Sequence, residues 1–245
     1  MLQIKYVEIE LPVKNLNRII QVDFISDIHA RSNKDIFFLI EALPKLSSEI
    51  LLLGGDYSEK EQFIEPLFSE LSKRYKRIIA VIGNNDLQFL DRILACAKQF
   101  GIELLRDETV RIDELTLVGT KDPYKEETHF AMPQAPALIL SHSPDILLSF
   151  STDCEVSVLC GHTHGGQIRF PFWPWWWTHT KVGREYGEGR SKRGNNEIFT
   201  SRGIGCSLMK IRNVPKEIYK VHLIPKCKRT TNGHVKEPRM DTNFH

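Results

Sequence analysis

Seven residues that can bind a metal ion each follow closely after a short apolar run of this chain. Two are aspartates, one is an asparagine and four are histidines: Asp27, His29, Asp56, Asn84, His142, His162 and His164. Imidazole and carboxylate ligands in combination suit Mn, Fe, Zn or Ni better than Ca or Mg. Two divalent ions held ~3.5–4 Å apart can activate water and bind the oxygens of a phosphoryl group during its displacement. The residue types therefore indicate a metal site, at which a pair of ions would be able to carry out such a displacement.

The apolar runs before these residues have the character of buried parallel strands. The runs cover residues 22–26, 50–54, 78–82, 137–141 and 156–160. Open α/β sheets bind their ligands just beyond the carboxyl ends of such strands. Each residue taken alone has a simpler explanation, because Asp and Asn often cap a helix that follows a strand. Five runs that all end in this way favour a shared metal site.

The remaining pattern predicts the elements that position these residues. Helices are expected at 35–46, 61–74, 87–100 and 144–150, with Gly101 as the C-terminal cap of the third. Further strands are expected at 4–13, on both sides of Asp113 and Glu114, and at 167–170, 197–201 and 217–224. We therefore predict an α/β fold in which two mixed β-sheets pack face to face in a sandwich flanked by helices.

Length and composition predict one globular domain. With 245 residues the chain can bury a large core, and we expect a single domain at 1–224 followed by a polar, disordered tail at 225–245. A hydrophobic share of 41% and a charged share of 26% are typical of soluble globular proteins. The net charge of +2 and the lack of a concentrated basic stripe do not indicate a nucleic-acid partner.

Cysteine usage and the N-terminal residues predict a cytoplasmic protein. The five cysteines are odd in number and form no C-x-x-C pair, so free thiols in a reducing compartment are expected. The first residues mix acids with apolar residues, unlike a signal peptide, and no apolar run reaches the ~18 residues of a membrane span. Any membrane contact should therefore be peripheral, at the cytoplasmic face.

The metal-binding residues form an ordered set of motifs: D-x-H at 27–29, G-D at 55–56, G-N-N-D at 83–86, S-H at 141–142 and G-H-T-H at 161–164. This set closely resembles the calcineurin-like metallophosphoesterases, whose pattern is D-x-H, G-D, G-N-H-(D/E), H and G-H-x-H. The resemblance covers residues 22–223. H-G-G-Q at 164–167 and S-R-G-I-G at 201–205 are similar to a bacterial branch that includes membrane-associated phosphoesterases and UDP-2,3-diacylglucosamine pyrophosphatases.

The resemblance implies a four-layer αββα fold and a dinuclear metal centre. Asp56 is the candidate for the bridging carboxylate. One metal site is expected to add Asp27, His29 and His164, and the other Asn84, His142 and His162. Manganese is the first expectation for the metal, with Fe, Zn or Ni as alternatives. We expect Asp86 and Glu59 to support the ligands from behind, Glu59 by bracing His29 or a loop.

Position 85 departs from the family pattern. It is Asn85 where most relatives carry a histidine that is thought to protonate the leaving group or brace the phosphate. Asparagine cannot donate a proton at neutral pH and can only form hydrogen bonds. The difference favours leaving groups that need little protonation, such as a nucleoside phosphate. Simple tolerance of Asn85 is an equally good explanation.

All four tryptophans lie in one segment, F-P-F-W-P-W-W-W at 170–177. We predict that Trp175, Trp176 and Trp177 contact an amphipathic substrate or a membrane surface. The alternative is a hairpin that covers a sheet edge or a dimer interface.

Four arginines are candidates to bind phosphate or pyrophosphate oxygens, because guanidinium matches their geometry. They are Arg31, Arg184, Arg190 and Arg202. Arg202 is the first choice, since it lies in the R-G-I-G turn, and with Asn85 it makes up the predicted catalytic pair.

The leading prediction is a phosphohydrolase acting on a phosphorylated small molecule or nucleotide-lipid, with UDP-2,3-diacylglucosamine in lipid A biosynthesis as the specific substrate. A phosphodiesterase for small nucleotides or diesters is the alternative enzyme. A catalytically weak interaction scaffold is a further alternative, although degenerate scaffolds tend to lose several ligands and all seven are present here.

Overall fold

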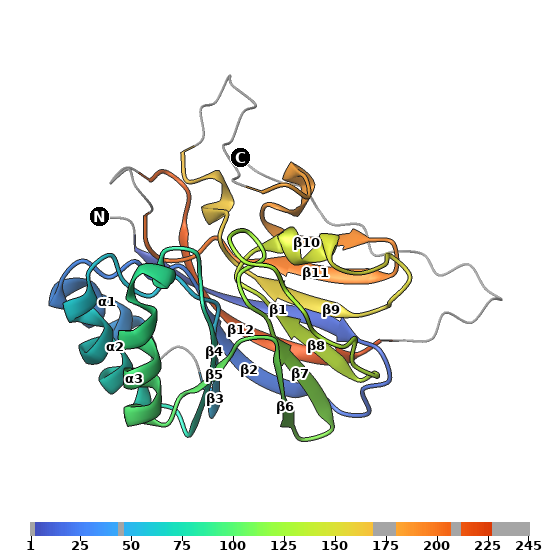
Figure 1. The fold of residues 1–245 in the computed structure, drawn as a ribbon, viewed down its shortest axis with the longest axis horizontal. Helices are drawn as coiled ribbons and strands as arrows, with labels where there is room; N and C mark the ends of the chain where they lie inside the picture. Colours follow the sequence, from blue (N-terminus) through green and yellow to red (C-terminus); the bar gives the residue numbers. More distant parts are fainter. Residues whose placement is uncertain (1–2, 44–46, 169–179, 207–211, 227–245) are drawn as a thin grey trace, which may run out of the picture.

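The computed structural model describes residues 3–43, 47–168, 180–206 and 212–226. Within these ranges the strands form two six-stranded mixed sheets (Figure 1). The first sheet has the order β1 (Ile4–Val13), β12 (Lys216–Pro225), β2 (Ile20–Ile25), β3 (Ile50–Leu53), β4 (Arg77–Val81) and β5 (Glu103–Leu105). The second has the order β10 (Gly189–Arg193), β11 (Asn196–Thr200), β9 (Ser157–Cys160), β8 (Ala137–Leu140), β7 (Leu115–Gly119) and β6 (Glu108–Ile112).

Strand pairing confirms the predicted parallel core. β2, β3, β4 and β5 pair in parallel, and so do β7, β8 and β9. β1 is an edge strand, as its alternating pattern predicts, and it pairs in parallel with β12 near the other end of the chain. Because β2, β3 and β4 run in the same direction, the loops after them all lie at the carboxyl ends of these strands.

A shared apolar core holds the two sheets face to face. Val22 and Phe24 of β2 belong to the same buried cluster as Leu138 and Leu140 of β8. Side chains alternate between the two faces of a strand, so Ile25 points away from this core and packs under the helices. The predicted sandwich is therefore confirmed.

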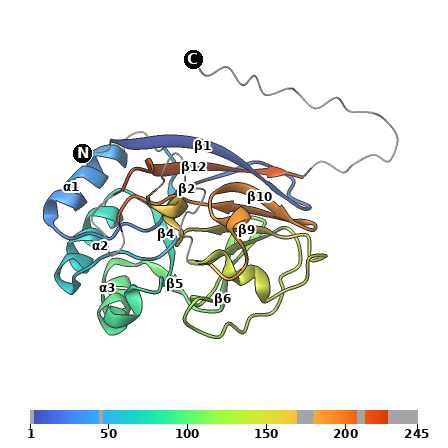
Figure 2. The same ribbon diagram turned by 90° about the horizontal axis from the view of Figure 1, so that it is seen from above.

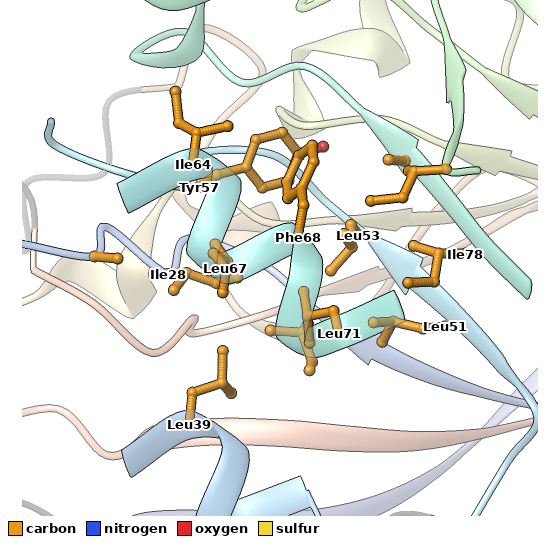
Figure 3. Close-up of a cluster of buried hydrophobic side chains, with 14 of the residues drawn as sticks. Ile28, Leu39, Leu51, Leu53, Tyr57, Ile64, Leu67, Phe68, Leu71 and Ile78 are labelled. Atoms are coloured by element: carbon orange, nitrogen blue, oxygen red, sulfur yellow. The ribbon is translucent and has the colours of Figure 1, made fainter. Parts of the chain in front are cut away.

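Three α-helices cover the outer face of the first sheet: α1 (Asn33–Ala42), α2 (Ile64–Ser72) and α3 (Leu90–Phe100). Figure 3 shows Leu67 and Leu71 of α2 above Leu51 and Leu53 of β3. Gly101 has a φ of 66° and ends α3, as predicted. Short 3₁₀ turns precede α2 and α3, which explains why these helices begin later than predicted.

The outer face of the second sheet differs from the prediction. The helix expected at 144–150 is a 3₁₀ turn, Pro144–Leu148, and the described residues place no α-helix on this face. Ser143 caps the turn and its Ile146 and Leu147 side chains cover the sheet. Only one α-helical layer is therefore present in these ranges. Two short strands, β5 and β10, were not predicted, because they have little apolar alternation.

Several sequence predictions fall outside the described residues. They concern the tail after residue 226, the tryptophan segment and residues 169–170 of the strand expected at 167–170, whose Gln167 and Ile168 are not in a strand. Cys96, Cys154, Cys160 and Cys206 are free thiols, as expected. Across the ranges that the structure covers, none of the helices is both long enough and apolar enough to cross a membrane.

Candidate metal centre

Loops from both sheets bring the predicted metal-binding residues together. Asp27 and His29 follow β2, Asp56 follows β3 and Asn84 follows β4, whereas His142 follows β8 and His162 and His164 follow β9. Backbone hydrogen bonds join these loops. The Asp27 N–H donates to the Gly55 carbonyl at 2.9 Å, and the Gly161 N–H donates to the His142 carbonyl at 2.9 Å. The predicted residues therefore converge at one end of the sandwich.

Two overlapping groups of side chains have the geometry of metal sites. One consists of Asp27, His29 and His164, and the other of Asp27, Asp56 and His142. Within each group the potential ligand atoms lie within 4.8 Å of one another, and every member is buried. Asp27 is common to both groups, which the sequence did not indicate. The side-chain amide of Asn84 and the ring of His162 adjoin the second group.

Asp56 faces imidazoles of both groups. Its Oδ2 lies 3.4 Å from Nε2 of His29 and 3.6 Å from Nε2 of His142. A carboxylate that bridges two ions needs such a position between the two ligand sets. Close packing requires glycine at position 83, because a Cβ there would lie 2.2 Å from Oδ1 of Asp56. The bridging role of Asp56 stays a prediction.

Asn84 and His162 lie on the His142 side of the centre. The Asn84 Oδ1 is 3.2 Å from His142 Nε2, and His162 Nδ1 is 3.2 Å from the same nitrogen. These contacts place Asn84, His142 and His162 together, in agreement with their predicted grouping. Their binding of a metal ion also stays a prediction.

Five of the predicted ligands have a left-handed backbone. The φ angles are 52° at Asp27, 47° at His29, 57° at Asp56, 74° at His162 and 51° at His164. Such angles are uncommon outside glycine and cost about 1–3 kcal/mol each, so the surrounding structure must impose them. Residues of this kind cluster at functional sites. The backbone therefore supports a functional site independently of the residue types.

Hydrogen bonds orient two of the histidines. His29 Nδ1 donates to Glu59 Oε1 at 2.6 Å, and His142 Nδ1 donates to the Gly54 carbonyl at 2.7 Å. A proton on Nδ1 leaves Nε2 as the nitrogen that can bind a metal ion. In both residues Nε2 is the atom that faces Asp56. The prediction that Glu59 braces His29 is confirmed.

Asp86 supports the loop that carries Asp56. Its carboxylate accepts hydrogen bonds from the backbone N–H groups of Asp56, Tyr57 and Gly83, at 2.7, 2.8 and 2.9 Å. The Asp86 side chain is fully buried, so these bonds replace water. The supporting role predicted for Asp86 is confirmed.

The charges of the centre are strongly coupled. Burial acts to raise the pKa of Asp27, but His164, His142 and His29 outweigh it and hold that pKa below its ordinary value. Burial acts to lower the pKa of His142, and the carboxylates of Asp56 and Asp27 raise it to about 9. Carboxylates and imidazoles thus stabilise one another. A bound cation would take the place of the imidazole protons, because metal binding requires deprotonated ligands.

The donor set fits divalent transition metals. Two ligand atoms bound to one ion at ~2.1 Å lie about 3.0–3.4 Å apart. The contacts of Asp56 Oδ2 with His29 at 3.4 Å and of His29 Nε2 with His164 Nε2 at 3.2 Å are in or near this range. Buried imidazole nitrogens and carboxylate oxygens are the ligands expected for Mn, Fe, Zn or Ni. The residues present could therefore hold the predicted metals.

The predicted substrate-contacting residues have diverse surroundings. Asn85 contacts Asp56, to which its side-chain amide donates at 2.7 Å. The Arg31 side chain is 28% exposed and donates to the Cys206 carbonyl at 2.7 Å. Arg202 donates to the carboxylates of Glu188 and Glu217 at 2.7 Å each. The guanidinium of Arg202 thus forms ion pairs with two carboxylates within the protein. The sequence did not indicate these ion pairs.

The remaining predicted substrate contacts include Arg184 and three tryptophans. Arg184 is exposed at the start of a 3₁₀ turn, Arg184–Tyr186. Trp175, Trp176 and Trp177 lie outside the described residues. Their roles stay predictions.

Three residues beside the centre were missed by the sequence analysis. Arg212 is buried, with its guanidinium 3.3 Å from Nδ1 of His164. The Tyr124 ring lies 4.7 Å from the ring of His162. Asp122 is buried, and burial raises its pKa to about 6. Asp122 follows β7 as the other candidates follow their strands, and this position was the available signal.

Comparisons with known proteins show the family to which this chain is similar. The family model for calcineurin-like phosphoesterases matches residues 20–166. An uncharacterized metallophosphoesterase of Helicobacter pylori strain J99 is 25% identical over 91% of this chain and 64% of its own length. Phosphodiesterase YaeI of Escherichia coli K12 is 27% identical over 82% of this chain and 81% of its own length. Among solved structures, phosphopantetheinyl hydrolase PptH of Mycobacterium tuberculosis aligns with a TM-score of 0.46 at 12% identity, covering 77% of this chain and 88% of that one.

The chain belongs to the calcineurin-like phosphoesterase family, because the family model covers more than half of it, from β2 to the end of the G-H-T-H motif. It spans 64% of the length of the H. pylori relative. The predicted superfamily is therefore confirmed.

Proposed function

We propose that this chain is a dinuclear metal-dependent phosphohydrolase that cleaves a phosphodiester or pyrophosphate bond. The position of Asp56 Oδ2, between His29 Nε2 and His142 Nε2, is the observation that carries the proposal. Membership of the phosphoesterase family and similarity to the E. coli phosphodiesterase YaeI support it. Manganese is the proposed metal, with Fe, Zn or Ni as alternatives.

Different side chains have different proposed roles at such a centre. Asp27, His29 and His164 would hold one ion, and Asn84, His142 and His162 the other, with Asp56 between them. Asp27 belongs to both groups of potential ligands and would therefore support both sites. Two bound cations would polarise the phosphoryl group and neutralise the charge that develops on its oxygens. Glu59 and Asp86 hold His29 and Asp56 in place. Burial of the ligands excludes bulk water, which strengthens every charge interaction in the centre.

Arg31 is proposed to bind the substrate phosphate. It follows His29 by two residues, and its guanidinium, tied to the Cys206 carbonyl, is held beside the centre. A planar guanidinium can contact two phosphate oxygens at once. Arg184 and Arg202 are proposed as further phosphate contacts, although substrate binding by Arg202 requires it to exchange a contact with Glu188 or Glu217.

UDP-2,3-diacylglucosamine, an intermediate of lipid A biosynthesis, is the specific substrate that we propose. Asn85 supports a pyrophosphate substrate, because a nucleoside phosphate leaves without prior protonation. Trp175, Trp176 and Trp177 are proposed to contact the acylated part or the membrane surface, which would place the protein at the cytoplasmic membrane face.

The second candidate function is hydrolysis of small nucleotides or other diesters. The similarity to phosphodiesterase YaeI of E. coli favours it. A non-catalytic scaffold is the remaining alternative. The assembled, buried ligand set argues against it, since a scaffold does not need seven metal-binding residues in one place.

One assay distinguishes these functions. The purified protein is loaded with Mn²⁺ and tested on UDP-2,3-diacylglucosamine in detergent, on its deacylated form and on a chromogenic diester, with Asp56→Ala as the control. A strong preference for the acylated nucleotide supports the lipid A substrate. Cleavage of the small diester alone leaves the phosphohydrolase and removes the lipid. Two bound metal ions without turnover of any compound would support the scaffold.

A further inference from the structure

A cavity of about 450 Å³ lies beside the candidate metal centre. Its walls come from α1, the start of β1, the loop after β2, the loop at 204–206 and the first residue of β12. Figure 2 shows α1 beside the N-terminal end of β1, where the cavity lies. Its volume is within the usual range of small-molecule sites, ~300–1,000 Å³.

Much of the wall is apolar. Aliphatic or aromatic side chains enter from every element except β12: Ile4, Ile28, Phe38, Ala42 and Ile204. Charged residues of both signs also contribute to the lining: Arg31, Lys216, Asp35 and Glu41. An apolar wall with a few charged groups fits an organic chain that carries a polar end.

The cavity and the metal centre share His29. This residue lines the cavity and belongs to the first group of potential ligands. Gly205 packs directly behind it, since a Cβ on Gly205 would lie 2.7 Å from the His29 Cβ. Arg31 also lines the cavity, and its bond to the Cys206 carbonyl joins the two loops at this point. A phosphoryl group at the centre is therefore within one residue of the cavity.

We propose that this cavity binds an apolar chain of the substrate, so that the preferred substrate is an amphipathic phosphoester with an acyl or alkyl group. This inference rests on the proposed phosphohydrolase activity and adds the site that selects the substrate. Arg31 binds the phosphate at the boundary, and the chain extends between Phe38 and Ile204. Burial of apolar surface in a preformed site lowers the KM of long-chain substrates.

The surface of α1 beside the cavity also suits an amphipathic molecule. Phe37 is 59% exposed, and its ring lies 6.0 Å from that of Phe38, which lines the cavity. The Lys34 ammonium lies 5.6 Å from the centre of the Phe38 ring. An exposed aromatic ring and an ammonium group side by side favour an anionic, apolar compound.

The test is a series of p-nitrophenyl alkyl phosphodiesters that share one leaving group and carry methyl, butyl, octyl or dodecyl chains. The Mn²⁺-loaded wild type is compared with Ala42→Phe, which narrows the cavity, and with Phe38→Ala, which widens it. Leu94→Phe adds the same ring at an exposed position of α3, 43% exposed, and serves as the matched control. Binding of a dansyl-labelled fatty acid, followed by fluorescence, gives a readout that does not depend on turnover.

We expect the wild-type KM to fall at least roughly tenfold from methyl to octyl, with kcat almost unchanged. Ala42→Phe should lose this dependence and the dansyl signal, Phe38→Ala should shift the preference to the longer chain, and Leu94→Phe should behave like the wild type. A KM that is independent of chain length overturns the cavity proposal while leaving the phosphohydrolase intact. If no diester is cleaved, the proposed function is tested with its pyrophosphate substrate, and the dansyl measurement decides the cavity alone.

Discussion

Asn85 donates two hydrogen bonds to the carboxylate of Asp56. Its backbone N–H donates to Oδ1 at 2.9 Å and its side-chain amide donates to Oδ2 at 2.7 Å. Oδ2 is the same oxygen that faces the imidazoles of His29 and His142. In this structure Asn85 therefore acts on the candidate bridging carboxylate, which the comparison of motifs alone did not suggest.

The first prediction follows from this pair. Asn85→Ala removes the side-chain bond to a charged acceptor, worth about 1.5–3 kcal/mol, and should reduce kcat/KM by roughly 10- to 100-fold. Gln88→Ala, which removes only a bond to the Asn85 carbonyl, is the control. Equal activity of the two variants would show that the bond to Asp56 has no part in turnover.

Asn85→His tests the other role of this position. If the position is that of a proton donor, the histidine variant should hydrolyse substrates with poor leaving groups relatively better than the wild type does. The measurement is the slope of log kcat/KM against leaving-group pKa for substituted aryl diesters. An unchanged slope removes position 85 from protonation of the leaving group.

Metal stoichiometry tests the double membership of Asp27. Because Asp27 belongs to both groups, Asp27→Ala should lose both ions, whereas His164→Ala should retain the ion of the second group. Elemental analysis of Mn²⁺-loaded, desalted protein gives the ratio of metal to protein. Retention of one ion by Asp27→Ala would mean that Asp56 and His142 suffice for a site without it.

Glu59 should affect metal affinity through His29. Glu59→Gln weakens the acceptor of the bond at 2.6 Å and should lower metal affinity by about 10- to 100-fold, as is usual for such supporting partners. Glu61→Gln, at an exposed position two residues further on, is the matched control. Competition with a fluorescent chelator measures the affinity. Equal metal affinities of the two variants would show that Glu59 has only a local structural role.

That the candidate ligands come together could be predicted from the sequence, because each of them lies close to the end of a strand. Each candidate ligand follows an apolar run, and parallel strands bring their ends together without further information. Glu59 and Asp86 were predicted as supports because they lie within the same loops. The contacts of Asn85 with Asp56 depend on loop conformation, which the spacing does not determine.

Arg212 shows what could not be predicted. It lies 48 residues after His164, outside every motif, and only the fold brings its guanidinium to that ring. The 3₁₀ turn at Pro144–Leu148 likewise replaced a predicted helix, since a run this short can be held by hydrogen bonds between residues three apart, such as the Ile146 N–H to the Ser143 carbonyl at 3.3 Å. Arg202 was predicted to bind phosphate, but in the structure its guanidinium donates to the carboxylates of Glu188 and Glu217. These two residues lie in other strands or turns, so the motif around Arg202 did not indicate them.

Arg212 should be essential for stability. Its guanidinium donates to the carbonyls of Gly205, Val214 and Pro215 at 2.7, 2.9 and 2.7 Å, among other bonds. Arg212→Lys leaves several buried carbonyls without a donor and should lower the free energy of unfolding by about 3 kcal/mol, or the Tm by roughly 6–12 °C. Arg92→Lys, in a surface pair with Glu65, should change little. Calorimetry measures the Tm of both variants. Equal Tm values would contradict the prediction for Arg212.

We predict that replacing Asp23 by asparagine raises the stability of the protein and that the gain depends on pH. This carboxyl of β2 is buried, and burial raises its pKa above the ordinary 3.8, although Ser48 and Tyr75 oppose part of the rise. Between the ordinary pKa and the raised one, the folded protein holds a proton that the unfolded chain releases, so stability falls as pH rises through this window. Asp23→Asn removes that loss.

The Asn variant should therefore be more stable than the wild type at neutral pH, by about 1 kcal/mol or ~2–4 °C in Tm. The difference should shrink as the pH falls below the ordinary pKa of 3.8, because the carboxyl is then protonated in both the folded and the unfolded state. Asp153→Asn, at an exposed position, should show no such trend. Thermal unfolding at a series of pH values measures the difference in stability between Asp23→Asn and the wild type. A difference that does not change with pH would mean that the charge of Asp23 is compensated in the folded protein.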